Sequence, residues 1–259
     1  MTVLTKPAES RLVDPQGWRR KFGVLGPSTN IHVQPDMEAM RPAGVTNHYA
    51  RIYTPNAEGL TDASFTSATQ TIADNVMIAL KDVLTLTPDY IVMGMSAITF
   101  YGGIKGATAF QKKLEDASGL GVSTGAFSCT AALRAYGGIK RIAFLSPYWP
   151  VANAAVRQYF EEEGFEVVRD LPLQRTSWLG IAATPLSMVR DAVHRLDGPD
   201  IDAIVQVGTN CSMVKLAAAA EMYLGKPVIA INTATYWHAL RSAGLPDKVY
   251  GMGRLLEEF

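Results

Sequence analysis

The chain contains an internal repeat, in which four short landmarks occur twice in the same order and with similar spacing. The pairs are GVLGPS at 23–28 with AFLSPY at 143–148, VMG at 92–94 with QVG at 206–208, GLGV at 119–122 with GKPV at 225–228, and ALR at 132–134 with ALR at 239–241. Four matched landmarks in one order are hard to produce by chance. We infer two copies of one strand–helix–strand–helix–strand–helix unit.

Short apolar, β-branched runs alternate with longer segments of helical periodicity, as in a parallel α/β sheet. Together with the repeat, this predicts an α/β fold of two pseudo-symmetric Rossmann-like halves, each a parallel sheet flanked by helices. We assign residues 20–125 plus 232–259 to one half and 126–231 to the other. Predicted strands are 22–26, 90–94, 122–124, 141–146, 166–169, 203–208 and 228–232, and predicted helices are 67–86, 108–118, 129–136, 151–163, 184–196, 213–224 and 234–243.

Duplication of a parallel α/β unit has a consequence for ligand binding. Ligands of such sheets collect beyond the carboxyl ends of the strands, where backbone N–H groups and helix N-termini point. Two units that face each other would therefore form one cleft lined by two sets of strand ends, and we expect the active site there. The plainer alternative is that the repeat reports a shared scaffold and nothing more.

Composition excludes several classes of protein. Lys+Arg and Asp+Glu are balanced at 24 each with no basic cluster, so nucleic acid is not an expected partner. The first 20 residues are polar and no apolar run approaches a membrane span, so we expect a cytoplasmic protein without membrane contact. The two cysteines and four histidines show no metal-ligand spacing, and no nucleotide-binding glycine motif occurs, so neither metal nor cofactor is expected.

Small and polar residues follow the predicted strands of the first half. The loop GPSTN at 26–30 can offer N–H groups and hydroxyls to an oxyanion, although the same residues also favour caps and turns. After the next strand, the segment 93–103 places small residues before an aromatic pair and two glycines. Its Ser96 is either a site residue or a helix cap.

Two candidate reactive groups follow strands of the second half. Tyr148 could donate its hydroxyl to a substrate carboxylate, although a lone tyrosine is more often a packing residue. Cys211 lies near a predicted helix start, where a thiol can act as acid, base or nucleophile, although a single cysteine is more often inert. Cys129 lies on an alanine-rich helix and is expected to pack in the core.

The ordered set of these loops resembles the maleate isomerase and arylmalonate decarboxylase family, within the aspartate/glutamate racemase superfamily. The resemblance runs from about Phe22 to Gly244 and includes the WHALR segment at 237–241. It implies two pseudo-symmetric halves with the active site between them, no metal or organic cofactor, and chemistry through a carbanion, an enediolate or a covalent adduct beside a carboxylate. It also implies one cysteine at each symmetry-related strand end: racemases use both, maleate isomerases use the first as nucleophile, and decarboxylases keep only the second as proton donor.

The sequence departs from that pattern at both cysteine positions. The first falls at Gly94 or Met95, which weakens racemase and isomerase assignments and is similar to the decarboxylase branch. The second aligns with Gly208, and Cys211 follows three residues later, near enough to reach the cleft only if the loop turns back.

We therefore predict a cofactor-independent decarboxylase, a lyase that acts on a substituted malonate or similar small dicarboxylate through an enediolate. The alternatives are a cis–trans isomerase or racemase of a maleate-like dicarboxylate, and a carboxylate-binding protein without activity. We expect a small carboxylate as ligand, a homo-oligomer, and a lid at 175–183. Predicted catalytic residues are Cys211 and Tyr148, and predicted substrate-binding residues are Pro27, Ser28, Thr29, Asn30, Gly94, Met95, Ser96, Gly208, Thr209 and Asn210.

Overall fold

The computed structural model describes residues 14–259, so most of the polar N-terminal segment lies outside the described residues. It contains two parallel four-stranded sheets with equivalent strand orders, β2-β1-β3-β4 and β6-β5-β7-β8. This confirms the predicted fold class of two pseudo-symmetric α/β halves. The strands are β1 (Arg20–Pro27), β2 (Val45–Ile52), β3 (Tyr90–Met93), β4 (Val122–Ser123), β5 (Arg141–Ser146), β6 (Glu166–Pro172), β7 (Ala203–Gln206) and β8 (Val228–Ala230).

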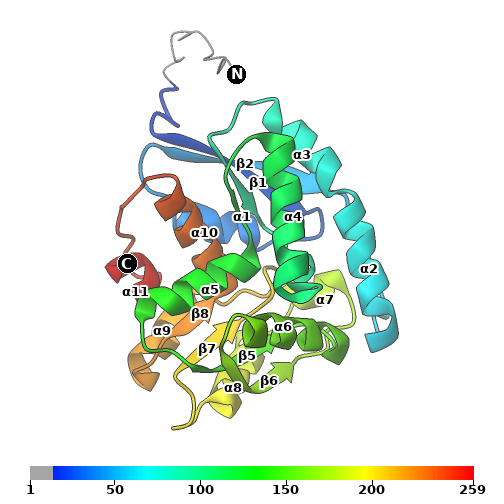
Figure 1. Cartoon of the computed structure of the whole chain (residues 1–259), viewed down its shortest axis with the longest axis vertical. Helices are drawn as coiled ribbons and strands as arrows, with labels where there is room; N and C mark the ends of the chain where they lie inside the picture. The colour runs from blue at the N-terminus through cyan, green and yellow to red at the C-terminus, as the bar shows by residue number, and fades with distance from the viewer. Residues whose placement is uncertain (1–13) are drawn as a thin grey trace.

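Helices pack around both sheets, one sheet in the upper part of Figure 1 and the other in the lower part. The inner strands β3 and β7 are buried along their whole length, as expected for strands of a covered parallel sheet. The helices are α1 (Val33–Ala39), α2 (Asp62–Asp74), α3 (Val76–Leu84), α4 (Gly103–Ser118), α5 (Gly125–Tyr136), α6 (Pro150–Glu162), α7 (Trp178–Ala182), α8 (Leu186–Leu196), α9 (Val214–Leu224), α10 (Ile231–Ser242) and α11 (Arg254–Glu258), with a 3₁₀ turn η1 (Ala97–Phe100).

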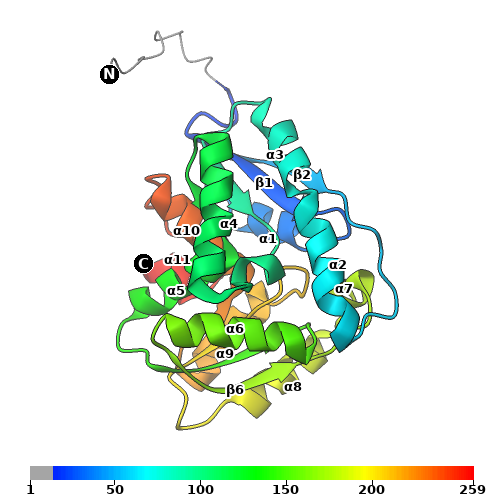
Figure 2. The same ribbon diagram turned by 45° about the vertical axis from the view of Figure 1, so that its right-hand side comes forward.

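The chain crosses between the halves after the last strand. Helix α10 follows β8 of the second sheet but packs against β3 and β4 of the first sheet and against α5. Short helix α7 lies beside α2 of the first half in both views (Figures 1 and 2), where the Trp178 and Phe65 rings meet at 5.5 Å. These contacts hold the two halves together around their strand ends. The boundaries assigned to the halves stay a prediction.

The structure corrects three predictions of local structure. Strand β2 was missed because it is an edge strand whose middle residues are polar and half-buried, so it shows no apolar run. Helix α1 was missed because it is short. The single helix predicted at 67–86 is two helices, α2 and α3, and the first begins earlier than predicted, at Asp62. The break between them lies at Asn75, whose side-chain amide donates to Thr71 O and Tyr53 O.

Within residues 14–259, no helix has the length and apolar character needed to cross a membrane.

Candidate active site

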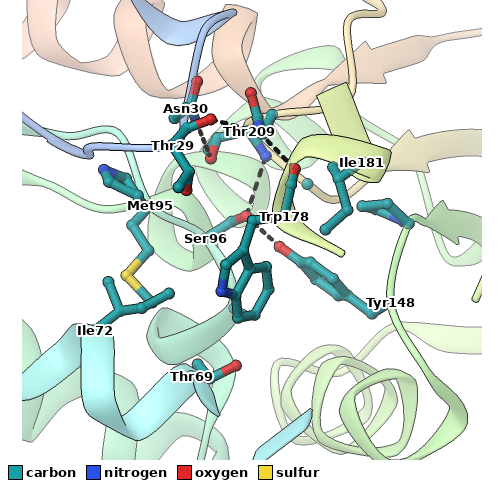
Figure 3. Close-up of a pocket in the computed structure, with 15 residues that line it drawn as sticks. Thr29, Asn30, Thr69, Ile72, Met95, Ser96, Tyr148, Trp178, Ile181 and Thr209 are labelled. Atoms are coloured by element: carbon teal, nitrogen blue, oxygen red, sulfur yellow. Dashed lines mark hydrogen bonds between the residues drawn. The ribbon is translucent and has the colours of Figure 1, made fainter. Parts of the chain in front are cut away.

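A cavity lies where the loops after β1, β3, β5 and β7 meet, at the carboxyl ends of both sheets (Figure 3). The cavity is small, with a volume of about 50 Å³. The lining comes from all four loops and from α2 and α7. It comprises Pro27, Thr29, Asn30, Thr69, Ile72, Met95, Ser96, Ala97, Pro147, Tyr148, Trp178, Ile181, Gly208, Thr209 and Asn210.

Three strand-end loops supply one hydrogen-bonded chain at the cavity. Ser96 Oγ, after β3, accepts a hydrogen bond from Thr209 N, after β7, at 3.2 Å. The Ser96 hydroxyl also forms a short hydrogen bond with the Tyr148 hydroxyl, after β5 (Figure 3). All three residues are buried. The chain Thr209 N–H, Ser96 O–H, Tyr148 O–H can therefore run in one direction and leave the phenol proton for a ligand.

Burial raises the pKa of Tyr148 above that of an ordinary phenol. The Ser96 hydroxyl and the Ala97 backbone N–H act in the opposite direction, because they stabilise the phenolate. Tyr148 is therefore protonated at neutral pH, and its conjugate base has hydrogen-bond partners in place.

Two asparagines of the cavity hold the halves together. Asn30 Nδ2 donates to Thr209 Oγ1 at 3.2 Å, and Asn30 Oδ1 accepts from the backbone N–H groups of His32 and Val33 at the start of α1. Asn210 Oδ1 accepts from Ile31 N at 3.0 Å, while Asn210 Nδ2 donates to backbone carbonyls. Both predicted binding residues line the cavity, but their polar atoms already have protein partners, so their main effect is to position the loops.

Apart from the hydroxyls of Thr29 and Thr69, the rest of the lining is apolar, and none of it is charged. Ile72 and Met95 face Trp178 and Ile181 across the cavity (Figure 3). No Lys, Arg, His, Asp or Glu is among the described residues that line it. The lid predicted at 175–183 contains helix α7, whose start is capped by Ser177 Oγ accepting from Gly180 N at 2.8 Å. It places an indole ring over the cavity.

The structure places Cys211 outside the cavity lining. The loop does turn back, since Cys211 N donates to Gly208 O at 3.0 Å, but the side chain is buried behind the loop. Burial raises the pKa of this thiol to about 12, with the Thr184 hydroxyl and Arg175 opposing the shift. The thiol is therefore neutral at ordinary pH, and it lies near enough to Tyr148 to contribute to the raised pKa of that phenol. Cys129 is fully buried in α5, as expected.

Of the positions expected to align with the family cysteines, Gly94 or Met95 and then Gly208, the two glycines are sterically closed. A Cβ atom at Gly94 would lie 2.7 Å from Val33 Cγ1 and 3.0 Å from Leu25 O. At Gly208 it would lie 2.4 Å from Pro147 Cδ, and φ there is +138°, which favours glycine. Gly208 lines the cavity through its backbone, whereas Gly94 lies behind it and Met95 lines it instead.

One further predicted residue is displaced from the site. Ser28 is exposed and does not line the cavity, because its Oγ accepts from Thr54 N at 2.9 Å on the outer side of the loop. In contrast, Thr69 and Ile72 of α2 and Ile181 of α7 line the cavity without having been predicted. No motif marks them, since they reach the site only through the packing of α2 and α7 against the strand ends.

The part of the chain that the structure describes contains no group of three or more His, Cys, Asp or Glu side chains that could hold a metal ion.

Fold and site together define the class: a pseudo-symmetric α/β enzyme with its site between equivalent strand ends. The family model for arylmalonate decarboxylase matches residues 31–256, and the chain belongs to this family. A maleate isomerase of Nocardia farcinica is 27% identical over 92% of this chain and 96% of its own length. An arylmalonate decarboxylase of Bordetella bronchiseptica is 28% identical over 64% of this chain and 70% of its own length.

Solved structures share the fold. The Nocardia farcinica maleate cis-trans isomerase, in a cysteine-to-serine mutant with a covalently bound succinylcysteine intermediate, has a TM-score of 0.84 at 24% identity, covering 93% of this chain and 99% of that one. An arylmalonate decarboxylase mutant in its liganded form has a TM-score of 0.80 at 20% identity, covering 93% and 100%. The family resemblance is thus confirmed, and with it the expectation of an isomerase or lyase.

Proposed function

We propose that the protein decarboxylates a substituted malonate or a similar small dicarboxylate without a cofactor. The supporting observation is the asymmetry of the cavity, which has the Thr209–Ser96–Tyr148 hydrogen-bonded chain on one side and an uncharged, largely apolar wall on the other. One carboxylate finds donors at the polar side. The other meets Met95, Ile72 or Trp178, where loss of a charged group as neutral carbon dioxide is favoured.

The reaction balances without a thiol. The bond between the α-carbon and the leaving carboxylate breaks, and its electron pair moves into the retained carboxylate to form an enediolate. The Tyr148 hydroxyl, whose proton the chain leaves for a ligand, stabilises this charge as a donor of an oxyanion hole does. The Tyr148 hydroxyl then gives its proton to the α-carbon, and the phenolate recovers a proton from solvent. The products are a monocarboxylate and carbon dioxide.

Isomerisation of a maleate-like dicarboxylate is the second candidate, and the similarity to maleate isomerases favours it. A covalent adduct would need a nucleophile in the cavity, and no cysteine is among the lining residues. A cis–trans isomerase here would therefore need a different group to add to the double bond. Carboxylate binding without turnover is the third possibility.

Proton NMR in D₂O distinguishes the three. Purified protein is incubated with phenylmalonate, methylmalonate and maleate, each beside a sample without protein. We expect the malonates to give monoacids with one deuterium at the α-carbon. Fumarate formed from maleate would instead establish the isomerase. Line broadening by all three acids without any product would show binding without turnover, and so contradict the proposal.

Cys211→Ser is expected to leave decarboxylation within about three-fold of the wild-type rate, because the buried thiol does not line the cavity. Initial rates with phenylmalonate measure this directly. A loss of two or more orders of magnitude would show that the loop opens and that Cys211 donates the proton.

The rate is expected to be independent of pH from about 6 to 9, because burial raises the pKa of Tyr148 above its ordinary value of about 10. The acid form is then fully populated over this range, and activity falls only at higher pH, where the phenol ionises. Rate profiles of kcat test this. A decline with a midpoint between about 7 and 9 would indicate an ordinary thiol or another group as the proton donor.

A further inference from the structure

The cavity has a second polar point, on helix α2. The Thr69 side chain is fully buried, lines the cavity, and its Oγ1 has no hydrogen-bond partner among the described residues. The neighbouring Tyr101 hydroxyl is likewise buried and without a partner of ordinary hydrogen-bond geometry within residues 14–259. Burial raises the pKa of Tyr101, and the hydroxyls of Thr69 and Thr66, which lie beside it, act in the opposite direction by hydrogen bonding.

Nothing in the helix requires Thr69 to be unpaired. A threonine inside a helix commonly donates to the carbonyl four residues earlier, and Thr71 of the same helix does so, to Ser67 O at 3.1 Å. Thr69 makes no such bond. A buried hydroxyl without a partner is unfavourable in a folded protein, and its usual explanation is a function or a bound group. Here the unpartnered hydroxyl belongs to a residue that lines the cavity.

The position of Thr69 separates it from the reacting groups. Figure 3 shows it at the far end of the cavity from Asn30 and Thr209, with Ile72, Met95 and the Trp178 ring between the two ends. A ligand whose carboxylate lies at the Ser96–Tyr148 end therefore reaches Thr69 only with the remote end of its substituent. The hydrocarbon part of that substituent would lie against the apolar wall.

The chemistry of this end indicates a neutral group. No cationic or anionic side chain lines the cavity within the described chain, and a carboxylate or ammonium buried beside one hydroxyl would lack compensation. A hydroxyl can donate to Thr69 Oγ1 and accept from it, so it fits a site made of hydroxyls. We propose that Thr69 is a specificity-determining residue that selects substrates whose hydrocarbon substituent ends in a hydroxyl group.

The inference about Thr69 rests on the proposed decarboxylation only where the substrate preference is measured as a reaction rate. A site with a buried hydroxyl for a substrate hydroxyl disfavours the analogue that lacks it, because the protein hydroxyl is then left unpaired. The preference expected for one neutral hydrogen bond is on the order of ten-fold in kcat/KM.

The test uses matched pairs of substrates with and without the hydroxyl. Phenylmalonate is compared with its 3-hydroxyphenyl and 4-hydroxyphenyl analogues, and butylmalonate with 3-hydroxypropylmalonate, in which a hydroxyl replaces the terminal methyl. Each is assayed with wild type, Thr69→Val and Thr71→Val. Valine keeps the shape of threonine and removes the hydroxyl, and Thr71 is an exposed threonine of the same helix.

We expect wild type and Thr71→Val to prefer a hydroxylated member of at least one pair by about ten-fold, and Thr69→Val to lose that preference, so that its kcat/KM is similar on both members. The melting temperature of Thr69→Val should equal or exceed that of wild type, since its hydroxyl has no partner to lose. No preference in either pair, or an equal loss on both members in Thr69→Val, would overturn the inference. The equal loss would assign Thr69 to the second carboxylate.

A binding assay separates this inference from the proposed reaction. Dissociation constants of the corresponding monoacids, such as phenylacetate and its hydroxyphenyl analogues, are measured by calorimetry with the same three proteins. A hydroxyl preference lost in Thr69→Val would support the inference even if no malonate were decarboxylated. Turnover of every malonate with no hydroxyl preference in rate or in binding would support the proposed function and overturn this inference.

Discussion

Tyr148→Phe is expected to slow decarboxylation by about 10²–10³-fold, with the loss mainly in kcat. The phenol supplies both a hydrogen bond to the developing enediolate and the proton that completes the reaction, and phenylalanine keeps the ring but neither function. In the variant the Ser96 hydroxyl loses its Tyr148 partner and can donate to the substrate, so KM should change less than kcat. Steady-state rates with phenylmalonate in the wild type and the variant measure the effect.

Tyr159→Phe is the matched control for that experiment. Its hydroxyl is also buried and hydrogen-bonded, to Thr130 at 3.1 Å, but Tyr159 does not line the cavity. We expect its rate to stay near that of wild type. Ser96→Ala should be intermediate, because it removes a partner of Tyr148 and leaves the phenol in place. If Tyr148→Phe and Tyr159→Phe had the same rate, Tyr148 would not be the proton donor.

Gly208→Ala is expected to destabilise the protein by about 2–4 kcal/mol, from the strain of a positive φ and from overpacking. The new Cβ would lie 2.4 Å from the Pro147 ring, in a loop held by hydrogen bonds to Gly208 O from Gln206 and Cys211. For a chain of this length, the melting temperature should fall by roughly 5–15 °C. Thermal and urea unfolding followed by circular dichroism measure both quantities.

Gly119→Ala separates the two causes. Gly119 has a φ of +68°, but its Cβ would meet no atom within 4 Å, so only the backbone strain applies. We expect a loss of about 1 kcal/mol there. Equal stability of the two variants would show that Pro147 moves aside without cost. In that case Gly208→Cys could install a thiol at this strand end, which the present packing does not permit.

The lack of side-chain space at the two glycines agrees with a tyrosine, and not a cysteine, as the proposed proton donor. Gly94 and Gly208 have no room for a side chain, so neither of these two positions can present a thiol to a ligand. The loops after β3, β5 and β7 instead bring a serine, a tyrosine and a backbone N–H into one chain. The proposed chemistry therefore keeps the location between two strand ends and changes the group that carries the proton.

Much of the fold follows from short-range features of the sequence. The repeat predicts two equivalent sheets, and apolar β-branched runs predict the inner strands, since these are buried on both faces wherever the rest of the chain goes. Strand β2 escapes this logic, because an edge strand needs only part of its surface covered and mixes polar residues with apolar ones. The break at Asn75 could not be predicted from the sequence pattern either, because the helical periodicity continues on both sides of it.

The sequence by itself determined that loops after equivalent strands of the two halves meet, and so it predicted Ser96, Tyr148 and Thr209 as neighbours. Only the tertiary structure decided which groups face the cavity: that Cys211 turns away, that Ser28 points outward, and that Thr69 and Trp178 enter from helices far along the chain. The physical reason is the distance along the chain between the residues that decide each feature. Strand burial depends on local pattern, whereas the direction of a loop side chain and the space beside a glycine depend on atoms that only folding brings near.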